Sequence, residues 1–156
     1  MKMPNWCEGT LKIRGDVEAI NKFMNEGLEV YNSRDGKSAC EPPRYDVWGA
    51  FSNVGKYGYV HVVGTRRGFV EEVLSCWDAE NDKQLALLYK QAWRIEAKEL
   101  QEIAKKFKLN MRIQGFECGM EFVQDIEVDD EGNLIHNDAF SYGDYFWQCP
   151  CPTMGG

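Results

Sequence analysis

The stretch NWCEGTLKIRGD, residues 5–16, decides the fold that the sequence predicts. Leu11 and Ile13 alternate with polar residues, which is the period-two pattern of a strand with one face against a protein interior. Gly15 ends this pattern, and Asp16 is a residue type that caps the N-terminus of a helix. The stretch therefore predicts a first strand that passes directly into a helix.

Two helices are predicted by apolar residues spaced three and four positions apart. The first helix is expected over about residues 17–27, and Gly27 ends it. Its buried face would carry Val17, Ile20, Phe23 and Met24. The second helix is expected over about residues 95–107, with a buried face of Leu100, Ile103, Ala104 and Phe107.

The remaining segments alternate between strand and turn patterns. Residues 31–45 are rich in Asn, Asp, Gly and Pro and predict a loop. A strand is expected from Leu109 to Ile113, and a turn at Asp129–Gly132. The predicted hairpins pair residues 48–51 with 57–63, 69–77 with 85–93, and 120–128 with 134–140.

This order of elements predicts an α+β fold of the ferredoxin-like, split βαβ type. Such a fold has an antiparallel sheet with two helices on one face, and here extra β-hairpins are added. A single domain is expected over residues 1–140, followed by a C-terminal tail over 141–156. Trp6, at the start of the first strand, is expected to be buried against the second helix or the following strands.

Four short motifs resemble the YubB-type ferredoxin-like family, small proteins encoded largely by phages and plasmids. They are Asn5-Trp6-Cys7, Gly64-Thr65, Ala92-Trp93 and the Glu117-x-Gly119-x-x-Phe122 block. The resemblance covers most of the chain from Asn5 to about Gly132. It implies the ferredoxin-like topology and an origin in a mobile genetic element, and no activity is established for the family.

The resemblance also bears on one ambiguous segment. Residues 85–89 suit a helix by intrinsic propensity, and the match of Ala92-Trp93 to the end of a family strand favours a strand. The chain departs from the family at Gly9, where a second Asn is usual, and at Gln91, which replaces a Thr. Arg66 and Arg67 replace a Lys-Trp pair, so a surface function at those positions would be altered.

Charge and composition narrow the classes of partner. The formal net charge of −7 argues against a bare binder of phosphate backbones and favours a partner with a basic surface. No apolar run approaches the roughly 18 residues of a membrane-spanning helix, and no signal peptide is evident, so the cytoplasm is expected. The six cysteines are scattered and predict free thiols, including Cys149 and Cys151 of the tail.

The sequence contains few of the residue patterns that catalytic or metal sites require. Nucleophilic catalysis requires a base beside the nucleophile, and the only histidines are His61 in a strand pattern and His136 in a polar hairpin. Zinc would require more ligands than Cys149 and Cys151 supply, and iron–sulfur ligand spacing is absent. We therefore expect no catalytic residues, no cofactor and no metal.

Two surface clusters remain as candidate binding sites. Glu121, Asp125, Glu127 and Asp129 are all odd-numbered, so they would share one strand face, either as a solvated surface or as a site for a basic partner. The second cluster resembles the aromatic strand of an RNA-recognition motif, whose rings stack on bases. It consists of Tyr57, Tyr59, Arg66 and Arg67.

The sequence favours a non-catalytic binding module of a mobile genetic element, acting through contacts with an unidentified protein. Complementary charge would guide such a partner to the acidic residues. The alternative is a binder of single-stranded nucleic acid that uses the aromatic strand face.

Overall fold

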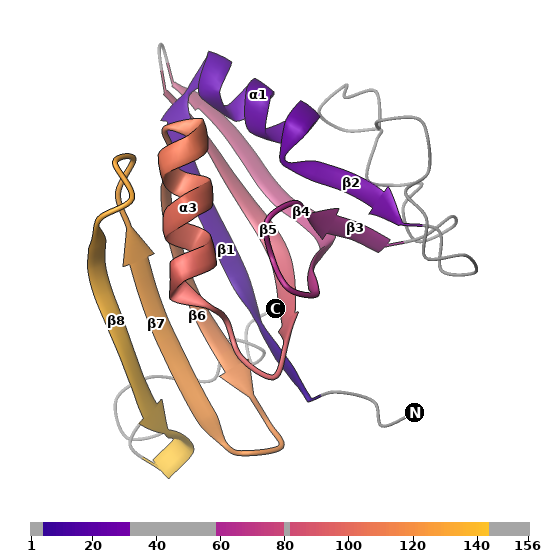
Figure 1. The fold of residues 1–156 in the computed structure, drawn as a ribbon, viewed down its shortest axis with the longest axis vertical. Helices are drawn as coiled ribbons and strands as arrows, with labels where there is room; N and C mark the ends of the chain where they lie inside the picture. Colours follow the sequence, from indigo (N-terminus) through magenta and orange to yellow (C-terminus); the bar gives the residue numbers. More distant parts are fainter. Residues whose placement is uncertain (1–4, 32–58, 80–81, 144–156) are drawn as a thin grey trace.

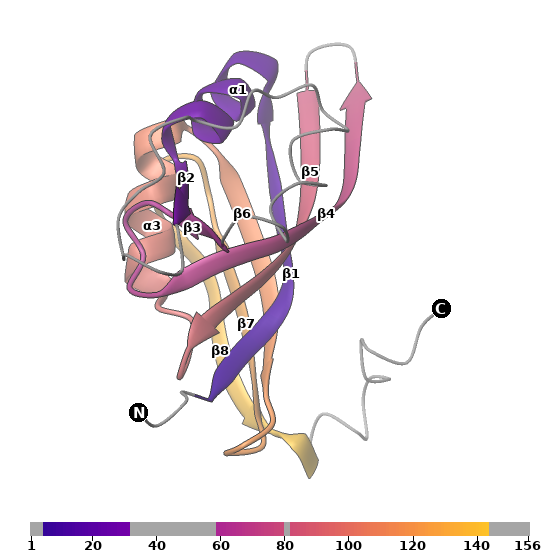
Figure 2. The ribbon, with the colours of Figure 1, turned by 90° about the vertical axis from the view of Figure 1, so that its right-hand side faces the viewer.

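The computed structural model describes residues 5–31, 59–79 and 82–143 of the chain. Within these ranges the protein is one eight-stranded sheet with two helices on one face (Figures 1 and 2). The helices are α1 (Val17–Glu26) and α3 (Ala97–Phe107). In chain order the strands are β1 (Trp6–Asp16), β2 (Leu28–Tyr31), β3 (Tyr59–Val62), β4 (Gly68–Ala79), β5 (Asp82–Ala92), β6 (Asn110–Glu117), β7 (Phe122–Val128) and β8 (Leu134–Ser141).

The sheet order corrects the expected fold class. The strands run β2-β3-β4-β5-β1-β6-β7-β8, and each neighbouring pair is antiparallel. A split βαβ unit leaves one strand between the two that its helix connects, but three strands separate β1 from β2, which α1 connects. The ferredoxin-like prediction is therefore wrong. The hairpins that we expected as additions are continuous with the sheet and enlarge it to eight strands.

The first stretch forms the centre of this sheet. β1 pairs along its whole length with β5, from Trp6 opposite Ala92 to Asp16 opposite Asp82. On its other side it pairs with β6. The side chains of Leu11 and Ile13 point to the helices and are buried, so the alternation in the sequence is confirmed.

The helices form where the apolar spacing predicts them. The Asp16 carboxylate accepts a hydrogen bond from the Ala19 N–H at 2.7 Å and caps α1 as expected. Ile20 and Phe23 are buried, whereas Val17 is exposed, contrary to expectation. The four apolar residues expected on the inner face of α3 are all buried.

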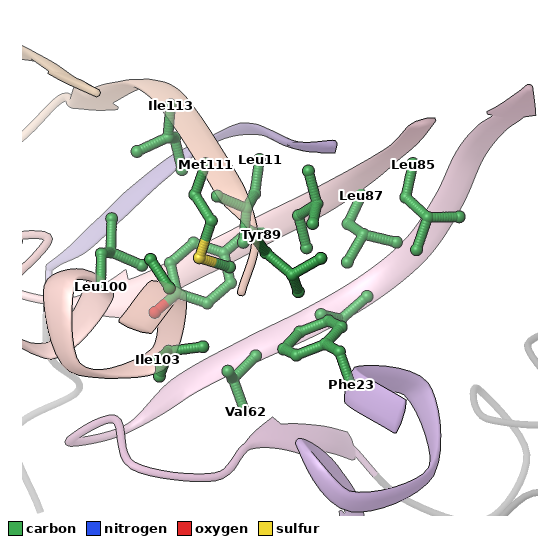
Figure 3. Packing of buried hydrophobic residues seen from close by; sticks show 14 of the residues in the cluster. Leu11, Phe23, Val62, Leu85, Leu87, Tyr89, Leu100, Ile103, Met111 and Ile113 are labelled. Carbon is green, nitrogen blue, oxygen red and sulfur yellow. The ribbon is translucent and has the colours of Figure 1, made fainter. Parts of the chain in front are cut away.

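The core lies between the two helices and the sheet. One strand that lines it, β5, confirms the strand prediction for residues 85–89. Leu85, Leu87 and Tyr89 alternate along β5 and point into this core (Figure 3). The ring of Phe23 contacts that of Phe107 edge to face, with centroids 5.5 Å apart. Residues 85–89 therefore form a strand because alternate side chains are buried in the core, although their intrinsic propensity favours a helix.

The other face of the sheet carries no helix in the described part of the chain (Figure 2). Trp6 points to this helix-free face, because it stands one position out of phase with Cys7 and Leu11. Its ring is half-buried and lies 6.0 Å from that of Phe69 on β4, so it does not pack on the second helix.

Some expectations concern residues outside the described ranges. These are most of the loop over residues 31–45, the hairpin strand at 48–51 with its turn, and the tail from residue 144 onward. No helix in the described residues is long and apolar enough to cross a membrane.

Candidate functional site

Three of the four motifs that carry the family resemblance lie at the lower end of the sheet in Figure 1, namely Asn5-Trp6-Cys7, Ala92-Trp93 and the Glu117 block. There β1 begins, β5 and β6 end, and α3 begins. The Trp93 N–H donates to the Asn5 carbonyl at 2.7 Å, and the Ala92 N–H donates to the Arg67 carbonyl at 3.2 Å. Asn5 also lies against Gly119, where a Cβ atom would stand 2.2 Å from the Asn5 amide nitrogen.

A buried glutamine fixes the segment between β5 and α3. The side chain of Gln124 accepts a hydrogen bond from the Ile95 N–H at 2.8 Å and donates one to the Ile95 carbonyl at 3.1 Å. Its oxygen also accepts from the Cys7 thiol at 3.6 Å. The Gln124 side chain thus satisfies both backbone polar groups of Ile95, as a neighbouring strand would. In the interior, unpaired backbone groups are costly.

A second glutamine, Gln91, ties the first turn of α3 to the β3–β4 loop. Its amide nitrogen donates to Glu99 at 2.6 Å and to the Arg66 carbonyl at 3.2 Å. Its oxygen accepts from the Glu96 N–H at 3.2 Å and from the Tyr89 hydroxyl at 3.1 Å. The sequence shows Gln91 only as a departure from the family. The available signal was a polar residue in phase with the buried side of β5.

The turn between β6 and β7 is held by a buried carboxylate. Glu117 is almost fully buried and accepts hydrogen bonds from the Gly119 and Met120 N–H groups at 2.7 and 2.6 Å. The Tyr142 N–H closes the other side by donating to the Glu121 carbonyl at 2.9 Å. The turn presents Met120 to solvent with 74% of its surface exposed.

Three residues at this end have left-handed backbone conformations without being glycine. The φ angles are 55° at Arg67, 73° at Trp93 and 56° at Glu121. Each such conformation costs on the order of 1 to 3 kcal/mol, and it persists only where surrounding contacts fix it. The side chain of Trp93 is 48% exposed despite its size. We call this surface the Trp93 end, defined by Arg66, Trp93, Arg94, Met120 and Glu121.

The Cys7 thiol, which belongs to the hydrogen-bond network beneath the Trp93 end, is not activated as a nucleophile. Burial raises the pKa of Cys7 to about 12, so the group is a protonated thiol at neutral pH. The described arrangement can present an aromatic ring and a methionine on a fixed backbone, and this is a property of docking surfaces.

The four acidic candidates do not form one solvated surface. Asp125 is buried, and its carboxylate accepts hydrogen bonds from Arg112 and Gln114, both at 3.2 Å. Glu127 forms an ion pair with Arg112 at 3.3 Å on the same face. Asp125 and Glu127 thus project to one face as predicted, but Arg112 on the neighbouring strand pairs with both, so they do not form a free acidic surface.

The other two acidic candidates lie beyond the ends of β7 and serve in turns. Asp129 accepts hydrogen bonds from the N–H groups of Glu131 and Asn133, and the hydrogen bonds from Asn133 lower the pKa of its carboxyl group. Glu121 precedes β7 and belongs to the Trp93 end.

Of the aromatic and arginine candidates, the structure describes the surroundings of Arg66 and Arg67 alone. Tyr57 lies outside the described residues, and Tyr59 begins β3. The backbone N–H of Arg66 donates to the Glu99 carboxylate of α3 at 3.1 Å, and its guanidinium lies 3.9 Å from Glu96. Arg67 instead lies over the Trp6 ring on the helix-free face, 5.6 Å from its centroid. The two arginines thus serve opposite faces of the sheet.

The ring nitrogens of both histidines lie close to oxygen atoms of neighbouring residues. The ring nitrogens of His61 lie 2.8 Å from the Glu29 carboxylate and 2.9 Å from the Thr65 carbonyl. His136 lies 3.0 Å from Asp138. Within the described ranges no group of three or more His, Cys, Asp or Glu side chains is arranged to hold a metal ion.

Comparison of the chain with protein-family models, curated proteins and solved structures found no match.

Proposed function

We propose that this protein is a non-catalytic binding module that acts through protein contacts at the Trp93 end. The observation that carries the proposal is Trp93 itself, a half-exposed ring on a left-handed backbone anchored to Asn5. Tryptophan and arginine dominate the binding energy of protein interfaces, and methionine is enriched in them. Arg94 and Met120 supply these residue types beside Trp93 or on the adjacent turn.

The rigid support favours binding. Arg94 is held by two hydrogen bonds to the Glu96 carboxylate, at 2.9 and 3.1 Å, and this pairing raises the pKa of its guanidinium group. Gln91, Gln124 and Glu117 fix the backbone below. A surface that is already ordered loses less conformational entropy on association, so more of the contact energy appears as affinity.

The class of partner follows from charge and from the resemblance. The net charge of −7 favours a protein with a basic surface, because complementary potentials speed the encounter of the whole molecule with such a partner. The YubB-type resemblance supports a phage or plasmid origin and therefore a role in the host cytoplasm. A basic host protein that handles nucleic acid fits this description.

The test is affinity capture of the full chain from a lysate of the natural host, followed by measurement of binding to each purified protein captured. Trp93→Asn removes the ring with a residue that tolerates the left-handed conformation. If Trp93 is an interface centre, this change weakens binding by about 2 kcal/mol or more, which calorimetry measures.

Ile135→Thr is the matched control, because it removes exposed apolar surface from the edge strand β8 while keeping a β-branched residue. It should leave binding unchanged. A partner that binds wild type and Trp93→Asn equally would refute the proposed surface.

A further inference from the structure

A second surface lies on the helix-free face, along β1. Lys12 stands opposite Ala86 of β5 and Arg112 of β6, and Arg14 stands opposite Gln84 and Asn110. Because Leu11 and Ile13 point into the core, Lys12 and Arg14 point to the other face. The register therefore brings three cationic side chains together from two adjacent strands.

This face is hollowed where the cations gather. A groove of about 570 Å³ is lined by Lys12, Arg14, Arg112, Gln84, Asn110 and Glu127 among others. A second hollow of about 330 Å³ continues from it along β1 and β6 and adds Thr10, Gln114 and Phe116 to its lining. The combined lining contains cations, amides and one aromatic ring, together with the Glu127 carboxylate and several apolar residues.

Cations also gather at the opposite end of β1. The half-buried Trp6 ring has Lys90 at 5.1 Å and Arg67 at 5.6 Å from its centroid. Lys90 stands opposite Glu8 and forms an ion pair with Glu71. The aromatic Phe116 stands opposite Glu8 on the other side of β1.

The cations of the groove differ in their partners. Arg112 is paired with Asp125 and Glu127, at 3.2 and 3.3 Å. Lys12 has no ion pair with any described residue. Several exposed carboxylates that contribute to the net charge of −7 belong to the helices on the other side, among them Glu18, Glu26 and Glu102.

We propose that the helix-free face binds single-stranded nucleic acid along β1. Such proteins combine a positively charged groove for the backbone with aromatic side chains on which bases stack. Lys12, Arg14 and Arg112 would contact phosphates, Phe116 would stack on a base, and the groove amides would bond base edges. From Trp6 to Arg14 the strand is about 26 Å long, enough for several nucleotides.

A nucleic acid fits this lining better than an acidic peptide does. An acidic peptide would use the cations, but a single strand brings a phosphate and a planar base at every nucleotide, which matches cations alternating with Phe116 and the groove amides. The inference uses a different face from the Trp93 end, so either proposal can fail while the other holds.

The experiment is fluorescence anisotropy of the full chain with labelled oligothymidylate and oligouridylate of about 15 nucleotides. Titrations at about 50 mM and 150 mM salt should show saturable binding that weakens as salt rises. In Lys12→Gln, Arg14→Gln the affinity at low salt should fall at least about tenfold, and the slope of log affinity against log salt should flatten by about 1.4, since each lost phosphate contact contributes about 0.7.

The matched control is Lys22→Gln, Lys98→Gln, which makes the same charge change at exposed positions on α1 and α3. It should bind within about twofold of wild type, since long-range charge effects are screened. Circular dichroism and thermal melting confirm that both double variants are folded. Absence of saturable binding at low salt, or equal loss in both double variants, would overturn the proposal. Tighter binding of a labelled oligoglutamate peptide would also overturn it, in favour of an acidic protein ligand.

Discussion

Single buried polar side chains determine the geometry of the Trp93 end. Gln124 makes two hydrogen bonds to Ile95, 29 residues away. Gln91 joins Arg66, 25 residues away, to the start of α3. Their phase with the buried side of a strand is visible in the sequence, but their hydrogen-bond partners are not, because those depend on which segments the fold brings beside them. Cys7 differs, since its place in a resemblance motif drew attention to it, and the structure shows a packing role.

Cys7 should be unreactive in the folded protein. Burial raises its pKa from about 9 to about 12, so very little thiolate exists at neutral pH, and solvent does not reach the sulfur. We expect iodoacetamide to modify exposed Cys118 at least about a hundred times faster than Cys7, as measured by peptide mass spectrometry.

The same pKa shift gives a direction for stability. Because the thiol ionises less readily when folded, its contribution to the free energy of unfolding is complete below pH 9 and is lost as pH rises toward 12.

The control for the alkylation experiment is the same reaction in urea, where Cys7 and Cys118 should react alike. Rapid alkylation of Cys7 in the native protein would show that the Gln124 network opens readily.

At the scale of elements, the sequence predicts local structure well and pairing poorly. Asp16 marks the start of α1, and Gly27 follows its end, as their residue types suggest. Alternation tells which side of a strand is buried, but it does not identify the neighbouring strand. The burial of Asp125 depends on Arg112 and Gln114 of β6, so the period-two pattern of β7 alone suggested a free acidic face.

The β6–β7 turn should depend on the charge of Glu117. Glu117→Gln keeps the shape but replaces a charged acceptor of two N–H groups with a neutral amide, and the buried site then holds an amide donor in place of one oxygen. We expect a loss of about 1.5 to 3 kcal/mol in the free energy of unfolding, measured by urea denaturation.

Glu102→Gln is the control for this change, because it removes a carboxylate from the exposed side of α3. It should alter stability by less than about 0.5 kcal/mol. Equal stability of Glu117→Gln and wild type would mean that the two N–H groups find other partners and that the turn does not need the carboxylate.

At the scale of the whole molecule, β1 organises the sheet because it occupies a central position in it. It lies between β5 and β6, so strands from the middle and later parts of the sequence complete the sheet on both sides of it. The helices then cover one face, and the other face is left with the Lys12 groove and the Trp6 ring. The ferredoxin-like expectation failed because the strands expected as added hairpins are continuous with the sheet. Most described strands were expected from the sequence, but β2 was not.

This arrangement predicts a gradient of local stability across the sheet. Backbone N–H groups of β1, β5 and β6 are enclosed by neighbours on both sides, whereas β2 and β8 lie at the edges of the described sheet. Native-state hydrogen exchange followed by mass spectrometry should therefore be slowest in β1 and its two neighbours and fastest in β2 and β8, because edge strands open at lower free energy.

The two edges also differ from each other. β8 is eight residues long and exposes Leu134 and Ile135, while β2 has four residues. A long edge strand with apolar side chains is a template for pairing with another chain. If β8 proves as protected as β1, and that protection weakens on dilution, a second copy covers this edge. Protection of β8 that does not depend on concentration would contradict the gradient, because the edge would then be stable within a single chain.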